Sequence, residues 1–150
     1  MNLSFVTAAA LVATLAMGAV VAIQPPVNAE LGRRTSDLAA AFLSVGISFA
    51  VLGLIFLLFG DLGSLTRVKD VPAIYLTGGV CGALFVAVSL VTVRHLGAAT
   101  TVGAFLCAQL IVAAILDQLG VLGLDQISLS PVRLLGIAAL VLGTILISFR

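Results

Sequence analysis

Charged residues are scarce in this chain, and their scarcity decides its class. Only 9% of the 150 residues are charged, 62% are hydrophobic, and the mean hydropathy is +1.34. A soluble globular domain carries about a quarter charged residues, so this composition excludes one. The net charge of +1 also argues against nucleic acid as a partner.

Groups that could bind a metal or perform catalysis are equally few. The chain has one histidine, His95, and two cysteines, Cys81 and Cys107, which both fall inside apolar runs. Buried small apolar residues explain these cysteines better than a disulfide or a metal pair. Since no nucleophile or metal ligand stands at a fixed spacing, we expect no enzyme, no catalytic residue, no metal site and no cofactor.

The chain does have five long apolar runs, four of which contain no Asp, Glu, Lys, Arg or His, while the fifth contains only Arg133, at its start. A helix needs about 20 mostly apolar residues to cross a bilayer. We therefore expect an all-α integral membrane protein with five transmembrane helices in a single domain, residues 1–150. The predicted spans are 3–23, 38–59, 73–93, 98–116 and 132–149.

The first run could be mistaken for a cleaved signal peptide, because small residues follow it at 27–29. However, no Lys or Arg precedes the run, and it is longer than a signal core of about 7–15 residues. We therefore expect a retained membrane helix.

Positive charges are divided almost evenly between the two sides of the predicted membrane protein. Orientation follows the excess of Lys and Arg in short loops, so a nearly equal division specifies neither orientation. We expect dual topology, in which the chain inserts both ways and pairs with its own inverted copy. Three positive charges lie on the side of Met1 and four on the other: Arg67, Lys69 and Arg133 against Arg33, Arg34, Arg94 and Arg150.

Small residues recur at a spacing of four and indicate candidate helix contacts. Gly78 and Gly82 are the clearest pair, with Gly79 beside them. Small faces allow the close backbone approach that holds helices together in lipid. We predict helix packing at these three glycines. Further pairs at the same spacing are Ala104 with Ala108 and Ala139 with Gly143.

Polar groups at membrane depth are candidates for function, because each costs free energy unless it is paired or wetted. Gln109 lies near the centre of the fourth run, where it forms either an interhelical hydrogen bond or a substrate contact. Asp117 lies near the membrane edge. It is a solvated helix end, a partner for Arg133, or a titratable gate.

A double proline follows the first run. Pro25 and Pro26 remove two backbone N–H donors and free carbonyls in the preceding turn. One interpretation is that they end the first helix and leave Gln24 and Asn28 among the lipid headgroups. The other is that this break lines a cavity, where transporters often place their substrate.

The sequence around this double proline resembles that of a known family. Residues 24–33, QPPVNAELGR, are similar to the QPxxNAxLGR segment of YdcZ-like proteins, which belong to the drug/metabolite transporter superfamily. The chain departs from the family at Arg94, Ala108 and Gln118, where proline, glycine and histidine are common. Other similar segments follow in order: GGVCGALFV at 78–86, LGAATT at 96–101, AQL at 108–110, LD at 116–117 and RLLG at 133–136.

The resemblance implies half of a ten-helix transporter fold, built from two inverted five-helix repeats and completed by dimerisation. The partner would be a second copy, as an antiparallel homodimer, or an oppositely oriented paralogue. The implied protein is a multi-pass exporter of the bacterial cytoplasmic (inner) membrane. It would move a small organic solute by alternating access.

Candidate site residues follow from the polar groups and the resemblance together. Substrate-binding candidates are Gln24, Asn28 and Gln109 in the cavity, with Thr100 and Thr101 near one entrance. If protons drive transport, the coupling group would be Asp117 or Glu30.

Other functions fit less well. Small multidrug-resistance antiporters, a related family, use a carboxylate inside the first helix, and residues 3–23 contain none. A passive pore would need a continuous polar face, which no run has. The main alternative is a structural or accessory membrane subunit, which would need no amide at the midplane.

Overall fold

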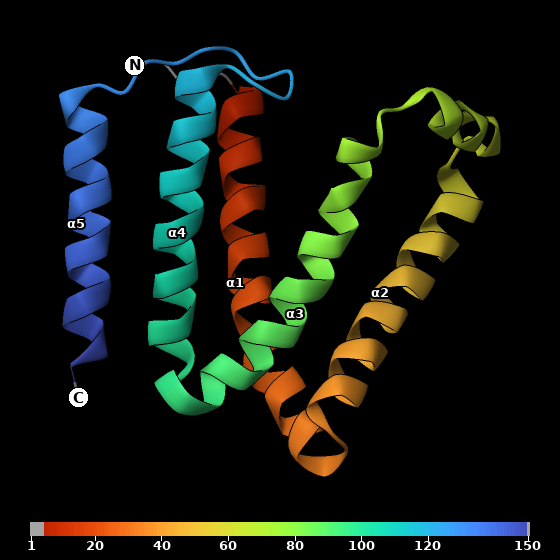
Figure 1. The fold of residues 1–150 in the computed structure, drawn as a ribbon, viewed down its shortest axis with the longest axis horizontal. Coiled ribbons are helices and arrows are strands. Elements are labelled where there is room, and N and C mark those ends of the chain that lie inside the picture. The colour runs from red at the N-terminus through yellow and green to blue at the C-terminus, as the bar shows by residue number, and fades with distance from the viewer. Residues whose placement is uncertain (1–4, 150) are drawn as a thin grey trace. The chain divides into compact units, whose positions relative to one another are not determined.

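The structure is a computed structural model that describes residues 5–149. Within this range every regular element is helical, which confirms the predicted all-α class (Figure 1). Leu3 and Ser4 of the first predicted span, and the counted charge Arg150, lie outside the described residues. The elements are α1 (Phe5–Arg34), α2 (Asp37–Phe59), η1 (Leu62–Asp70), η2 (Ala73–Leu76), α3 (Thr77–Leu96), α4 (Ala98–Leu119) and α5 (Pro131–Ser148).

Five helical stretches of the described chain are long and apolar enough to cross a membrane, as predicted. The third combines the 3-10 helix η2 with α3 and extends over Ala73–Leu96. Only Gly97 separates α3 from α4, and its φ of 79° is a backbone conformation that glycine adopts readily.

Serine side chains begin two of the helices. Ser36 precedes α2, and its Oγ accepts a hydrogen bond from the Ala39 N–H at 3.2 Å. Ser130 precedes α5 in the same way, with Oγ accepting from the Arg133 N–H at 3.3 Å. Pro131 follows at the first helical position, where its missing N–H has no intrahelical acceptor to lose.

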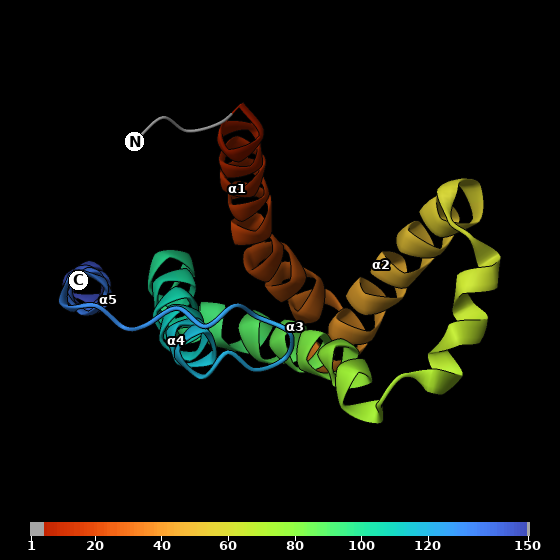
Figure 2. The same cartoon turned by 90° about the horizontal axis from the view of Figure 1, so that it is seen from above.

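Helix α1 is longer than predicted, because it continues through Pro25 and Pro26 and ends at Arg34. The interpretation that the prolines end the helix is therefore wrong, and the break that the other interpretation assumed is a continuous helix with two prolines inside it. A proline ring fixes φ near the helical value, so its main costs are a lost hydrogen bond and a local bend. Figure 2 shows α1 changing direction along its length. Ala29 packs into the core beyond the prolines and helps to hold the second half of the helix.

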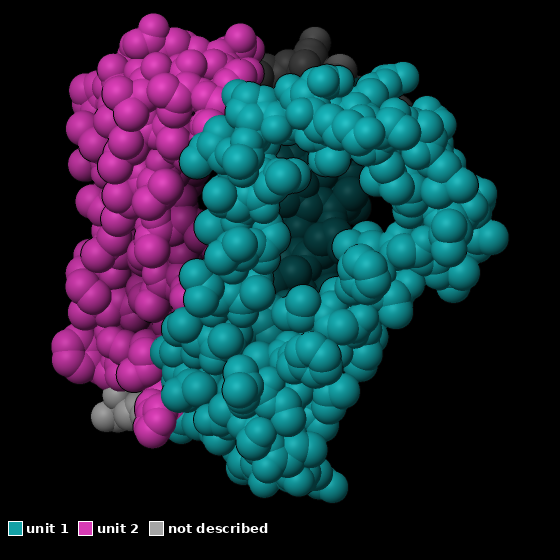
Figure 3. All heavy atoms as spheres, turned by 45° about the vertical axis from the view of Figure 1, so that its right-hand side comes forward, with its two compact units in different colours: residues 1–94 teal, residues 95–150 magenta. Residues whose placement is uncertain are grey.

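The chain divides into two compact units, residues 1–94 and 95–150, shown in different colours in Figure 3. The predicted single domain stays a prediction. The core of the first unit joins α1 and α2 to the second half of α3, and small alanines let the helices approach closely. This core consists of Ala29, Ala40, Ala41, Val86, Leu90 and Val93.

Away from this core, the first unit is open. Figure 3 shows a hollow in its face. A cavity of about 400 Å³ lies between α2 and α3, lined by residues that include Ser48, Gly79 and Gly82. Most large apolar side chains of α2 are exposed, among them Phe42 and Phe49. Such a surface suits lipid or another membrane helix.

The second unit is an antiparallel pair of helices, α4 and α5 (Figure 1). A Cβ atom added at Gly103 would lie 2.9 Å from Thr144 Cγ2, so glycine permits this close approach. The Cys107 sulfur lies 3.2 Å from Thr144 Oγ1. Ala104 and Ala108 were expected at a helix contact but are exposed. The contact is made instead by Gly103 and Cys107, which are also small and also four positions apart.

Candidate functional site

The double-proline region of α1 places two predicted substrate-binding residues on one helix face. Gln24 and Asn28 are four positions apart in a continuous helix, so they share a face. Gln24 is half-buried and Asn28 is 6% exposed. Among the described residues, the Asn28 amide nitrogen has no hydrogen-bonding partner. Buried polar groups in proteins are nearly always paired, so this donor marks a candidate for ligand binding.

Backbone acceptors lie next to these amides. In a regular helix the carbonyl of residue i accepts from the N–H of residue i+4. Pro25 and Pro26 have no N–H, so the carbonyls of Val21 and Ala22 lose their usual partners. The face of α1 that carries Gln24 and Asn28 therefore offers both donors and acceptors.

Glu30, one of the two coupling candidates, is already engaged by its own helix. Its Oε2 accepts from Arg33 Nε at 2.8 Å, and its Oε1 accepts from Arg34 Nε at 2.9 Å. Both carboxylate oxygens thus face guanidinium groups. Glu30 therefore has a partner for each of its oxygens, and the cluster at the end of α1 keeps one positive charge in excess.

An ion pair between Asp37 and Arg94 closes the same end of the first unit. It joins the first turn of α2 to the last turns of α3, and Arg94 Nε also donates to the Leu90 carbonyl at 3.2 Å. Gly32 lies beneath the pair, since a Cβ there would be 2.9 Å from Asp37 Oδ1. This pair was not predicted from the sequence. Its only sequence signal is an acid that starts one helix and a base that ends another.

Two threonines occupy the first turns of α4. Thr100 is half-buried, whereas Thr101 is fully buried, and its Oγ1 has no hydrogen-bonding partner in the described chain. Gln109 lies two turns further along α4 and is exposed. A polar side chain on the outer surface of an apolar helix needs a partner from outside its own helix pair.

Asp117 pairs with Arg133, which confirms one of its three interpretations. Arg133 Nη2 lies 2.5 Å from Asp117 Oδ2 and joins the end of α4 to the start of α5. The adjacent Gln118 fixes the intervening loop, with Oε1 accepting from the Leu129 N–H at 2.6 Å. This role of Gln118 was not predicted, and nothing local in the sequence indicates the contact.

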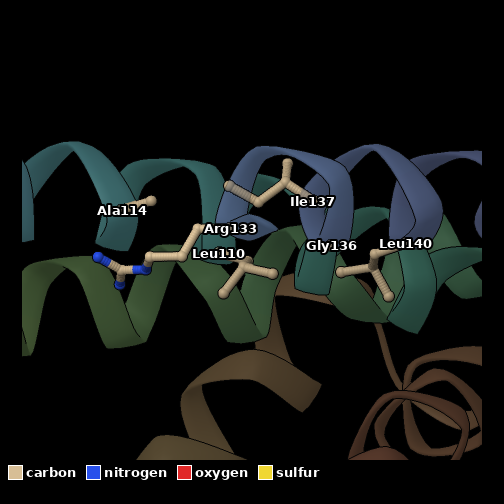
Figure 4. A pocket seen from close by; sticks show the side chains of 6 residues that line it. All are labelled: Leu110, Ala114, Arg133, Gly136, Ile137 and Leu140. Carbon is tan, nitrogen blue, oxygen red and sulfur yellow. The ribbon is translucent and has the colours of Figure 1, made fainter. Parts of the chain in front are cut away.

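Arg133 also borders a cavity of about 380 Å³ between α4 and α5. Figure 4 shows its long side chain beside the apolar groups of the two helices. Because the lining is almost entirely aliphatic, the cavity offers shape but little hydrogen bonding. The other residues that line it are Leu110, Ala114, Gly136, Ile137 and Leu140.

The predicted site residues therefore fall into two groups. Gln24 and Asn28 share α1, whereas Thr100, Thr101 and Gln109 belong to α4. No metal site is added, since the described residues contain no cluster of three or more potential ligands. The predicted packing glycines Gly78, Gly79 and Gly82 have no described atom within 4 Å of an added Cβ, so their packing role stays a prediction.

Comparison with known proteins gives one match. A protein family described as "Putative inner membrane exporter, YdcZ" matches the chain over residues 9–146. No curated protein and no solved structure matches it. The match covers nearly all of the chain and includes both groups of site residues.

Proposed function

The chain belongs to the YdcZ family, and from this membership we propose that it exports a small organic solute across the inner membrane. The family's description as an exporter supports a transport function, which is not an enzyme class. Together with the five apolar helices, it identifies a multi-pass inner-membrane protein. The substrate, the mode of movement and the assembly are parts of the proposal.

The unpaired amide of Asn28 is the observation that carries the proposal. A transporter must recognise its solute by polar groups that the protein itself leaves unsatisfied. Asn28 meets this condition at 6% exposure, and Gln24 lies one turn before it. Gln109, Thr100 and Thr101, on α4 of the second unit, stay further candidates for binding the solute.

The working form in this proposal is an antiparallel homodimer. Two inverted copies would supply the ten helices of an inverted-repeat transporter. The nearly equal division of positive charges supports insertion in both orientations. The exposed glycines Gly78, Gly79 and Gly82 support close approach by a second copy, because nothing within the described chain occupies the space beside them.

Alternating access in such a dimer needs a group that responds to the driving ion. Asp117 is the better candidate of the two acids, because its single ion pair with Arg133 links α4 to α5. Protonation of Asp117 would release Arg133 and loosen that link. Glu30 is less suited, since two arginines of its own helix hold it.

A transport screen tests the proposed export. Vesicles containing the purified protein, and protein-free vesicles, are loaded with a mixture of small metabolites, and the retained compounds are measured by mass spectrometry. We expect selective loss of a few compounds only where the protein is present. Asn28→Leu should abolish this loss, whereas Val27→Leu, a control at an exposed neighbouring position, should not.

The alternative is an accessory membrane subunit with no transport of its own. In that case no compound would leave the vesicles faster with the protein than without it. The exporter proposal would then fail. The exposed Gln109 would instead be explained as a contact with the partner protein.

A further inference from the structure

We infer that α1 carries a binding site for an uncharged solute that both donates and accepts hydrogen bonds. The amide of Asn28 donates to the solute, and the carbonyl oxygen of Val21 accepts from it. This inference rests on the proposed transport function and adds the chemical class of the substrate. Its basis is the arrangement of donors, acceptors and ion pairs in the first unit.

The donor is the Asn28 side chain. It is more than nine-tenths buried, and no acceptor within the described chain pairs with its amide nitrogen. A purely structural asparagine in a helix core would normally bond a neighbouring side chain or carbonyl, because an unpaired buried amide is costly. A solute with an acceptor group would satisfy it.

The acceptor comes from the double proline. Pro25 cannot donate to the Val21 carbonyl, so this oxygen keeps its bonding capacity in the middle of a helix. Val21, Gln24, Pro25 and Asn28 follow the spacing i, i+3, i+4, i+7, which places them on one helix face. Val21 and Asn28 are about 10 Å apart along the axis at 1.5 Å per residue. A small solute can bridge this distance with Gln24 between its ends.

The ion pairs decide the charge of the solute. In the first unit, the acids of α1 and α2, Glu30 and Asp37, are both paired with arginines. Arg33, Arg34 and Arg94 are the partners in these pairs, so each acid and each arginine of these helices already has an ion-pair partner, although three arginines face two acids. An ion moved to the Asn28 face would lose its hydration and would have to compete with these existing pairs for a counter-charge, which is more costly than moving a neutral polar group.

The composition of the chain permits a direct test, because Asn2 and Asn28 are its only asparagines. In an Asn2→Ser protein labelled with ¹⁵N-asparagine, the single side-chain amide signal in the NMR spectrum belongs to Asn28. The full chain in lipid nanodiscs is titrated with three probes of similar size: N-methylacetamide, which is neutral, propionate, an anion, and n-butylammonium, a cation.

We expect N-methylacetamide to shift the Asn28 amide signal saturably, with an apparent affinity about tenfold or more above that of either ion. Pro25→Ala restores an N–H for the Val21 carbonyl and should lower the affinity for N-methylacetamide several-fold. Pro72→Ala, in the loop before η2, is the matched control and should leave the affinity unchanged.

Two results overturn the inference. One is a saturable shift by propionate or n-butylammonium as strong as the shift by N-methylacetamide, which would mean that the site accepts ions. The other is no shift with any probe, which would make Asn28 a structural residue.

Failure of the export proposal and failure of the binding-site inference give different results. If the vesicle screen finds an exported ion, the export proposal stands and the neutral-solute site on α1 falls. If N-methylacetamide binds but no compound is exported, the site stands and transport falls.

Discussion

Thr144 of α5 lies so close to Gly103 of α4 that a side chain on the glycine would force one of the two residues to shift. Its Cγ2 would be 2.9 Å and its Oγ1 3.0 Å from a Cβ atom at position 103. Cys107, one turn further along α4, contacts the same threonine. The two helices can therefore approach closely at this contact because position 103 has no side chain.

This contact makes the stability of the second unit sensitive to one methyl group. Gly103→Ala should lower the free energy of unfolding by about 1–3 kcal/mol, because an overpacked contact must shift backbone or side chains. Thr144→Ala in the same chain should recover most of the loss. The thermal midpoint in detergent measures both. Gly143→Ala on α5, where an added Cβ meets nothing within 4 Å, is the control, and an equal loss there would contradict this explanation.

The features that were predicted correctly depend on the local sequence. The five spans follow from apolar length, which is a property of each stretch of sequence by itself. The Asp117–Arg133 pair was among the interpretations because the two residues flank one loop.

The features that were missed depend on tertiary contacts. Whether a helix continues past Pro25 and Pro26 depends on what its far half packs against, and that core includes residues from α3. The Asp37–Arg94 pair joins residues 57 positions apart. The choice of Gly103 over Ala104 for the contact with α5 depends on the rotation of α4, which a row of small residues cannot specify when two such rows lie side by side.

A tag fused after Arg150 should be detected on both sides of the membrane in comparable amounts. The reason is the near balance of positive charges, three against four, which gives no strong preference for either orientation. Adding two lysines beside Arg67 should bias the chain to one orientation and lower its activity when it is expressed alone. Detection of the unmodified chain in a single orientation would reject the antiparallel dimer.

Asp117→Asn should make export independent of a proton gradient while leaving the protein folded. The substitution keeps the shape and a hydrogen-bonding oxygen for Arg133 but removes the titratable charge. Export is measured in vesicles with and without an imposed pH difference. Asp125→Asn, in the loop between α4 and α5, is the control. An unchanged response to the gradient in Asp117→Asn would limit Asp117 to a structural role.

Gln109→Leu should leave the protein folded and inserted but remove transport. In the described chain the side chain is exposed and makes no hydrogen bond within its own unit, so stability should change by about 1 kcal/mol at most. In a dimeric cavity, leucine would leave polar groups of the solute unpaired. Solute efflux and the thermal midpoint are measured on the same preparation. Normal efflux would assign Gln109 to the lipid surface or to helix packing.

Replacing the prolines of α1 should separate stability from activity. Pro25→Ala and Pro26→Ala each restore a backbone N–H, so the carbonyls of Val21 and Ala22 regain their helical partners and the bend in α1 is reduced. A proline inside a helix costs about 3 kcal/mol relative to alanine, and recovery of part of this should raise the thermal midpoint. The same change removes a free acceptor from the Asn28 face and the flexibility of the bend, so efflux should fall although the protein is more stable. A more stable variant with full efflux would mean that the bend serves neither binding nor movement, and the role of α1 would then have to rest on Gln24 and Asn28 alone.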